Sequence, residues 1–169
     1  MKKFLVLILG IFFFYECSTS KEINVDTAAI KKEVHILLVN WHKAASEANF
    51  EEYFGKMDSA AVYIGTAAEE IWTKKQFAAF SKPYFDKGKA WNFKTLERNV
   101  YVNENGNFVW FDELLITWMG TCRGSGVLEK KDTIWKIKHY VLSVTIPNDD
   151  IQAVILAKKK NDALFLEKY

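Results

Sequence analysis

The ionisable residues best placed to do chemistry are Asp112, Glu113, Arg123, His139 and His42. A carboxylate held among large apolar side chains has a raised pKa because burial disfavours its charge, whereas a neighbouring arginine lowers that pKa. Either environment can tune a group for general acid–base catalysis. Asp112 and Arg123 could equally form a structural ion pair across neighbouring strands, and a β-bulge would decide which face each occupies. The residues by themselves leave both interpretations open.

Other kinds of site find little support in the sequence. His35 and His42 would be two helical turns apart, roughly 10 Å along the axis, too far for one metal ion with ligands at about 2 Å. There is no His-Glu-x-x-His or Cys-x-x-Cys motif, and Gly124-Ser125-Gly126 lacks the later glycine of a dinucleotide loop. The 23 basic and 21 acidic residues leave a net charge of only +2. We therefore expect no metal, no cofactor and no nucleic-acid partner.

The first residues resemble an export signal. Two lysines precede an apolar stretch, 4–15, which as a helix would be roughly 18 Å long and too short for a bilayer core of about 30 Å. Residues 1–17 are therefore predicted to be a signal peptide. Cys17 at its end resembles the lipidated cysteine of bacterial lipoproteins, with 18–25 as a polar tether. Because Glu16 stands where that motif has a small residue, simple secretion and an uncleaved anchor remain alternatives.

These features predict a location for the protein. We expect an exported protein of the cell envelope, either a periplasmic or outer-membrane lipoprotein held to the membrane by its lipid anchor, or a secreted protein.

The rest of the chain shows helical spacing first and strand patterns afterwards. Apolar residues recur every three or four positions after Asp26, a candidate helix cap. Asn105-Gly106 marks a hairpin turn, and Pro147 ends the last strand. The expected elements are helices at 27–48, 50–57 and 73–88, strands at 60–64, 92–103, 108–118, 120–129 and 134–146, and a last helix within 148–169. Helices followed by antiparallel hairpins predict an α+β fold.

Alternation along two strands indicates which faces are buried. In 134–143, His139 shares a face with Trp135 and Ile137, so it is predicted to point with the apolar set. In 108–116 both faces are apolar. A strand that is buried on both sides needs helices on one side and another layer on the other. For a single small domain, the simplest second layer is another copy of the chain.

A series of short motifs runs along residues 27–155. They are Trp41-His42, Phe50 to Phe54, Val62-Tyr63-Ile64-Gly65-Thr66, Trp72-Thr73, Phe77, Lys82-Pro83-Tyr84-Phe85, Trp110-Phe111-Asp112-Glu113, Arg123-Gly124-Ser125-Gly126-Val127-Leu128, Trp135-Lys136-Ile137-Lys138-His139-Tyr140 and Leu142-Ser143. In this order and spacing they resemble the SnoaL-like branch of the nuclear transport factor 2-like (NTF2-like) superfamily.

The resemblance implies a conical fold. A curved antiparallel sheet would wrap over about three N-terminal helices, with a pocket between sheet and helices and dimers formed through the outer sheet face. The SnoaL-like domain would span 26–147, and 148–169 would add a C-terminal helix. Members of the superfamily include isomerases, dehydratases, cyclases, hydrolases and pocket proteins without a known reaction, so the fold transfers more safely than the function.

The resemblance also implies site residues. Asp112 would be the base, His139 or Tyr63 a hydrogen-bond donor and Arg123 the charge partner, as in ketosteroid isomerase, where an aspartate works with oxyanion donors in an apolar site. The pocket walls would be side chains on the surrounding elements, namely Trp41, His42, Tyr53, Tyr63, Trp72, Phe77, Tyr84, Trp91, Trp110 and Trp118.

Three functional hypotheses follow from these observations. The first is an exported homodimer that binds a small apolar or aromatic molecule in a conical pocket, without assured catalysis. The second is an acid–base isomerase, dehydratase or hydrolase that uses Asp112, His139 and Arg123. The third is a docking module that binds a partner chain at the cell envelope through its outer sheet face and last helix.

Overall fold

The computed structural model describes residues 25–169, so the expected signal peptide and Cys17 lie outside the described residues. The helices are α1 (Thr27–Ser46), α2 (Phe50–Gly55), α3 (Lys74–Asp86) and α4 (Ile151–Leu166), and a 3-10 turn, η1 (Asn148–Asp150), precedes α4. The strands are β1 (Met57–Ile64), β2 (Ile71–Thr73), β3 (Lys94–Val102), β4 (Phe108–Thr117), β5 (Gly120–Lys131) and β6 (Ile134–Val144). The predicted α+β class is confirmed, and the elements follow the expected order apart from the short strand β2, which was not predicted.

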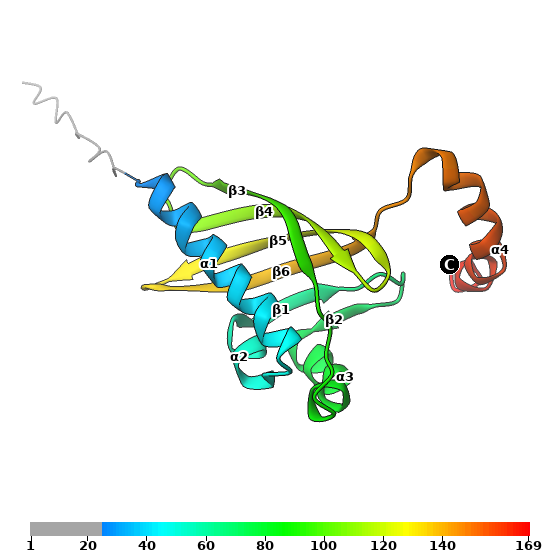
Figure 1. Ribbon diagram of the computed structural model, residues 1–169, viewed down its shortest axis with the longest axis horizontal. Coiled ribbons are helices and arrows are strands. Elements are labelled where there is room, and N and C mark those ends of the chain that lie inside the picture. Colours follow the sequence, from blue (N-terminus) through cyan, green and yellow to red (C-terminus); the bar gives the residue numbers. More distant parts are fainter. Residues whose placement is uncertain (1–24) are drawn as a thin grey trace, which may run out of the picture.

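The strands form one six-stranded sheet in the order β2-β1-β6-β5-β4-β3. The sheet curves, α1 crosses one of its faces, and α2 and α3 lie toward the side of β1 and β2 (Figure 1). We call the opposite face the outer face. The hairpin series from β3 to β6 is antiparallel, but β6 runs parallel to β1. The sheet is therefore antiparallel apart from this one pairing.

Local signals in the sequence fix the ends of these elements. Asp26 caps α1 by accepting a hydrogen bond from the backbone N–H of Ala29 at 2.9 Å. Thr73 and Gln76 form a reciprocal capping box at the start of α3. Gly106 adopts a φ of +67° in the turn between β3 and β4, a conformation that glycine tolerates without strain.

Aromatic rings fill most of the space between the helices and the sheet. Trp41 of α1 is 1% exposed, stacks on Tyr53 with ring centroids 4.9 Å apart, and meets Tyr140 edge-on at the same distance. Phe77 and Phe85 of α3 close the same cluster. Because interdigitated rings leave little void, the depth of the cone is a packed core.

One irregularity in β6 decides which of its residues face the helices. The pairing with β5 skips Lys138 between Ile137 and His139, which is a β-bulge. Beyond the bulge, Tyr140 is buried beneath the helices and His139 lies on the outer face. The prediction that His139 shares the face of Ile137 is wrong, because the extra residue inverts the alternation of the strand.

Helix α4 lies beside the sheet at one end of the molecule (Figure 1). None of its residues is buried, so it adds little to the core. Within residues 25–169, no helix is both long enough and apolar enough to cross a membrane.

Candidate functional site

A cavity of about 160 Å³ opens where the β1–β2 connection, α3, the segment after α3 and the β4–β5 turn meet. We call it the rim cavity, because the two strand connections lie at the same end of the sheet (Figure 1). Its walls are largely aromatic. The lining residues are Tyr63, Gly65, Thr66, Glu70, Trp72, Phe77, Phe80, Trp91, Phe93, Trp118, Met119 and Leu142.

Stacked rings make the floor of the rim cavity rigid. Tyr63 lies face to face with Phe77, their centroids 3.9 Å apart and their planes 15° from parallel. Trp72 stacks on Phe80 at 4.7 Å. Trp118, at the β4–β5 turn, is 81% exposed and forms no ring pair within the described part of the chain. The cavity therefore combines a fixed aromatic floor with a tryptophan free to cover a ligand.

A single carboxylate lies in the wall of the rim cavity. Glu70 accepts a hydrogen bond from the backbone N–H of Ala67 through Oε2 at 3.1 Å. Its side chain lies over Gly65, where an added Cβ would collide with that same oxygen. Gly65 is thus the residue type that lets the carboxylate sit in this turn.

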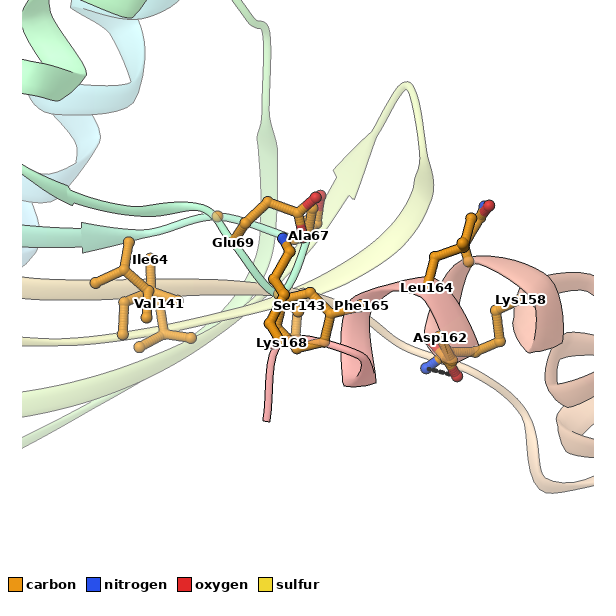
Figure 2. Close-up of a pocket in the computed structure, with 15 residues that line it drawn as sticks. Ile64, Ala67, Glu69, Val141, Ser143, Lys158, Asp162, Leu164, Phe165 and Lys168 are labelled. Carbon is orange, nitrogen blue, oxygen red and sulfur yellow. Dashed lines mark ion pairs between the residues drawn. The ribbon is translucent and has the colours of Figure 1, made fainter.

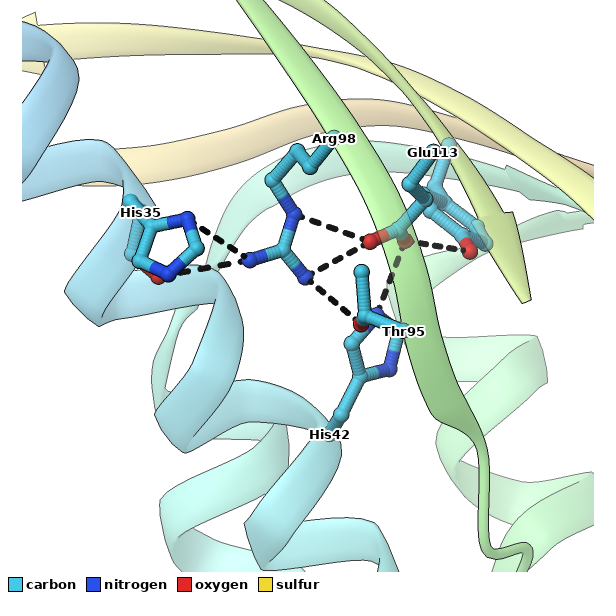
Figure 3. Close-up of polar contacts among 6 residues, drawn as sticks. His35, His42, Thr95, Arg98 and Glu113 are labelled. Carbon is cyan, nitrogen blue, oxygen red and sulfur yellow. Dashed lines mark hydrogen bonds and ion pairs between the residues drawn. The ribbon is translucent and has the colours of Figure 1, made fainter. Parts of the chain in front are cut away.

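A second polar group, Glu113, lies buried in the core between the helices and β4. Its Oε1 accepts hydrogen bonds from His42 Nε2 at 2.8 Å and from the Tyr140 hydroxyl at 2.9 Å. Its Oε2 accepts two from Arg98, Nε at 3.0 Å and Nη2 at 2.6 Å. The arginine also donates to Thr95 Oγ1 at 3.2 Å, so α1, β3, β4 and β6 meet in one network (Figure 3).

The charges of the network decide its protonation. Burial by itself would raise the pKa of Glu113, but the hydrogen bond and charge of His42 and the charge of Arg98 outweigh burial and lower that pKa. Burial and the neighbouring Glu113 raise the pKa of Tyr140, which therefore keeps the proton it donates. Glu113 is therefore a charged carboxylate whose two oxygens both already accept hydrogen bonds. Such a group is a weak base, so its role is to stabilise the fold and not to remove a proton from a substrate.

The proposed catalytic residues lie elsewhere. Asp112 and Arg123 meet on the outer face, with Nη1 and Oδ1 3.2 Å apart. His139 is on the same face, but no hydrogen bond or ion pair among residues 25–169 joins it to either. The structure therefore brings Asp112 and Arg123 together on the side of the sheet away from the rim cavity, and their catalytic role stays a prediction.

The aromatic candidates divide by location. Tyr63, Trp72, Phe77, Trp91 and Trp118 line the rim cavity. Trp41, His42 and Tyr53 are buried in the core, whereas Tyr84 is exposed on α3 and Trp110 on the outer face.

Phe80 and Glu70 were missed as site residues, whereas Glu113 was named among the ionisable candidates but was given no role. Phe80 follows Phe77 by one helical turn, which places both on one side of α3. Glu113 alternates with Val109 and Phe111 along β4, which places a carboxylate on the buried face. Glu70 had no such signal, because its position depends on the shape of a turn.

Two larger hollows lie outside the aromatic core. One, of about 740 Å³, lies between α4 and the β1–β2 connection (Figure 2), and because α4 buries no residue, one of its walls is weakly held. The other, of about 580 Å³, is a groove between α1, α2 and the β5–β6 hairpin. The rim cavity is the one of these three that is lined mainly by aromatic residues of the packed core or packed against it, so it is the best candidate for a ligand site.

The family model described as "SnoaL-like domain" matches residues 34–147. The chain belongs to the SnoaL-like domain family. The match covers the residues from α1 to the end of β6, so α4 lies beyond the SnoaL-like region. No curated protein matches the chain.

Solved structures share the fold of this SnoaL-like protein. An NTF2-like protein of unknown function from Pseudomonas putida KT2440 is 12% identical, with 72% of this chain and 91% of that chain covered and a TM-score of 0.62. An NTF2-like protein from Cytophaga hutchinsonii is 14% identical, with 68% and 98% covered and a TM-score of 0.58. The association domain of CaMKII from C. elegans is 21% identical, with 69% and 97% covered and a TM-score of 0.58. At these identities the likeness establishes the fold.

Proposed function

We propose that this SnoaL-like protein binds a small, compact molecule in the rim cavity. An apolar cavity of about 150 Å³ holds one benzene-sized molecule, and the rim cavity measures about 160 Å³. A ligand of one ring or a short branched chain therefore fits, whereas a steroid-sized molecule exceeds the space.

The observation that carries this proposal is the exposure of Trp118 above a rigid aromatic floor. Large aromatic side chains concentrated at one exposed place mark contact sites on soluble proteins. Tyr63 and Phe77 are held by the core and cannot close the gap, whereas Trp118 is 81% exposed and can cover a bound molecule.

Thermal unfolding and tryptophan fluorescence with a panel of phenol, indole, toluene and cyclohexanol test the proposal. A ligand at a hundredfold excess over its Kd should stabilise the fold by about 2.7 kcal/mol. Trp118→Ala should weaken binding roughly 3- to 10-fold. Trp110→Ala, which removes an exposed tryptophan from the outer face, should leave affinity unchanged. A panel without any shift in midpoint or fluorescence would reject the proposal.

We also propose that two copies pair through the outer face. Trp110 is 46% exposed there and stacks on Tyr101, with centroids 5.7 Å apart. The neighbouring pair of Asp112 and Arg123 supplies both signs of charge, which suits a two-fold interface where each patch meets its own copy.

Export and lipid anchoring through Cys17 are proposals that rest on the sequence of the first residues. Metabolic labelling with palmitate in a bacterial host should mark the native chain and not Cys17→Ser. Labelling of both or of neither would contradict lipidation at this cysteine.

A further inference from the structure

We infer that the rim cavity selects small organic cations, such as quaternary ammonium compounds, over neutral molecules of the same shape. This inference rests on the proposed function, because it names the class of ligand for the same cavity. It follows from the rings, the single charge and the turn that make up the walls.

The walls are built from the ring types that attract a cation, and among the described residues Trp118 has no other ring stacked on it. A cation within about 6 Å of a tryptophan, tyrosine or phenylalanine ring is attracted by the negative ring face, most strongly by tryptophan. Trp72, Trp91 and Trp118 all line the cavity, together with Phe93. Three indoles around one small space are more than a neutral apolar ligand requires, since aliphatic walls would serve it equally well.

The charge of the cavity has one sign. Of the described residues that line it, only Glu70 carries a formal charge, and no lysine or arginine is among them. Glu70 forms no ion pair with any residue that the structure describes, although several surface carboxylates of this chain do. Its Oε2 is held by the Ala67 N–H, which leaves Oε1 for a ligand. A cation would therefore find a counter-charge that no side chain already neutralises.

The position of this charge is built into the turn. The Glu70 carboxylate lies over Gly65, and its backbone closes the turn through hydrogen bonds with Gly65 and Ala67. Because a Cβ at Gly65 would collide with the carboxylate, Gly65→Ala should move the charge without removing it. The charge and the rings can thus be varied separately.

Choline and 3,3-dimethylbutan-1-ol provide the decisive comparison, because the second replaces the quaternary nitrogen of the first with carbon. Titration calorimetry and tryptophan fluorescence on the purified protein should show choline binding at least about tenfold more tightly. Glu70→Gln should remove most of that ratio, and Gly65→Ala should reduce it. Glu69→Gln, the neighbouring carboxylate outside the rim cavity, should leave the ratio unchanged.

The outcomes separate this inference from the proposed function. Equal affinity for the two compounds, or tighter binding of the alcohol, would overturn the cation inference while the rim cavity remains a binding site. An unchanged ratio in Glu70→Gln would overturn the role of the carboxylate and, with it, the inference. Absence of binding by both compounds would also overturn it, and the proposed function itself would fail only if the neutral aromatic panel gave no response as well.

Discussion

His42 Nε2 lies 2.8 Å from Glu113 Oε1, although the two residues are 71 positions apart in the chain. This bond joins the first helix to β4, the neighbour of the edge strand β3, inside a core that is largely apolar and aromatic. Arg98 on β3 supplies the opposite charge at 2.6 Å. The buried carboxylate therefore holds three separate segments in register, and removal of any one partner leaves charges or donors unmatched.

Arg98→Met should destabilise the protein by about 3–5 kcal/mol, because it leaves Glu113 buried without the arginine that pairs with it. Chemical denaturation followed by fluorescence measures this change. Arg123→Met, at the exposed ion pair on the outer face, is the matched control and should cost less than about 1 kcal/mol. Equal effects of the two substitutions would contradict the structural role of the network.

The double variant Arg98→Met with Glu113→Leu should be less destabilised than the sum of the two single variants. Each single change leaves one charged group buried without its partner, whereas the double change removes both members of the ion pair. A strictly additive result in a double-mutant cycle would mean that the two groups do not interact in solution.

Stability should fall at acid pH through Glu113. Its pKa is lowered from the usual value near 4.5 in the folded state, so the unfolded chain binds the proton more readily. The resulting stabilisation is fully present above pH 4.5 and is lost as the pH falls through the folded pKa. Unfolding midpoints measured from pH 7 to 3 should decline in this range, and Glu113→Gln should show a shallower decline. Part of the decline with falling pH should remain in Glu113→Gln, because the pKa of Asp58 is also lowered in the folded state.

Gly124→Ala should destabilise the fold by roughly 1–3 kcal/mol. An added Cβ would collide with the Tyr140 hydroxyl and approach Glu113 Cγ to 3.0 Å. Gly55→Ala is the control, because nothing lies within 4 Å of its added Cβ and alanine favours a helix by about 0.5–1 kcal/mol. Thermal unfolding should move the two midpoints in opposite directions, and a shared direction would contradict the close packing at Gly124.

Trp110→Lys should convert the proposed dimer to a monomer, because it puts an unpaired charge in the apolar part of the proposed interface. Sedimentation at micromolar concentration measures the mass of both proteins. Ile134→Lys, another exposed apolar residue (58%) but at the β5–β6 turn, should leave the dimer intact. A monomeric native protein would reject pairing through this face.

The sequence predicted the elements well because their signals are local. Asp26, Thr73 and Gly106 act through bonds and torsions within a few residues, and the structure confirms each. The aromatic lining was partly predictable for the same reason, since Trp72 and Phe77 flank the start of one helix.

The face of each ionisable residue was less predictable, because it depends on the register of whole strands. One extra residue, Lys138, moved His139 to the outer face. The choice of Asp112 over Glu113 followed an analogy with related enzymes, whereas alternation along β4 puts Glu113 on the buried side. The dense packing of the interior had no local signal in the sequence either, since it depends on how rings from six elements pack together.

The placement of the ligand site at the rim has a kinetic consequence. A molecule can reach the Trp118 side of the cavity from solvent without displacing any ring of the packed floor. Association should then be limited mainly by encounter, and the residence time should be set by the few contacts at the opening. Such a site suits rapid, reversible binding of a ligand from solution better than long-term retention of that ligand.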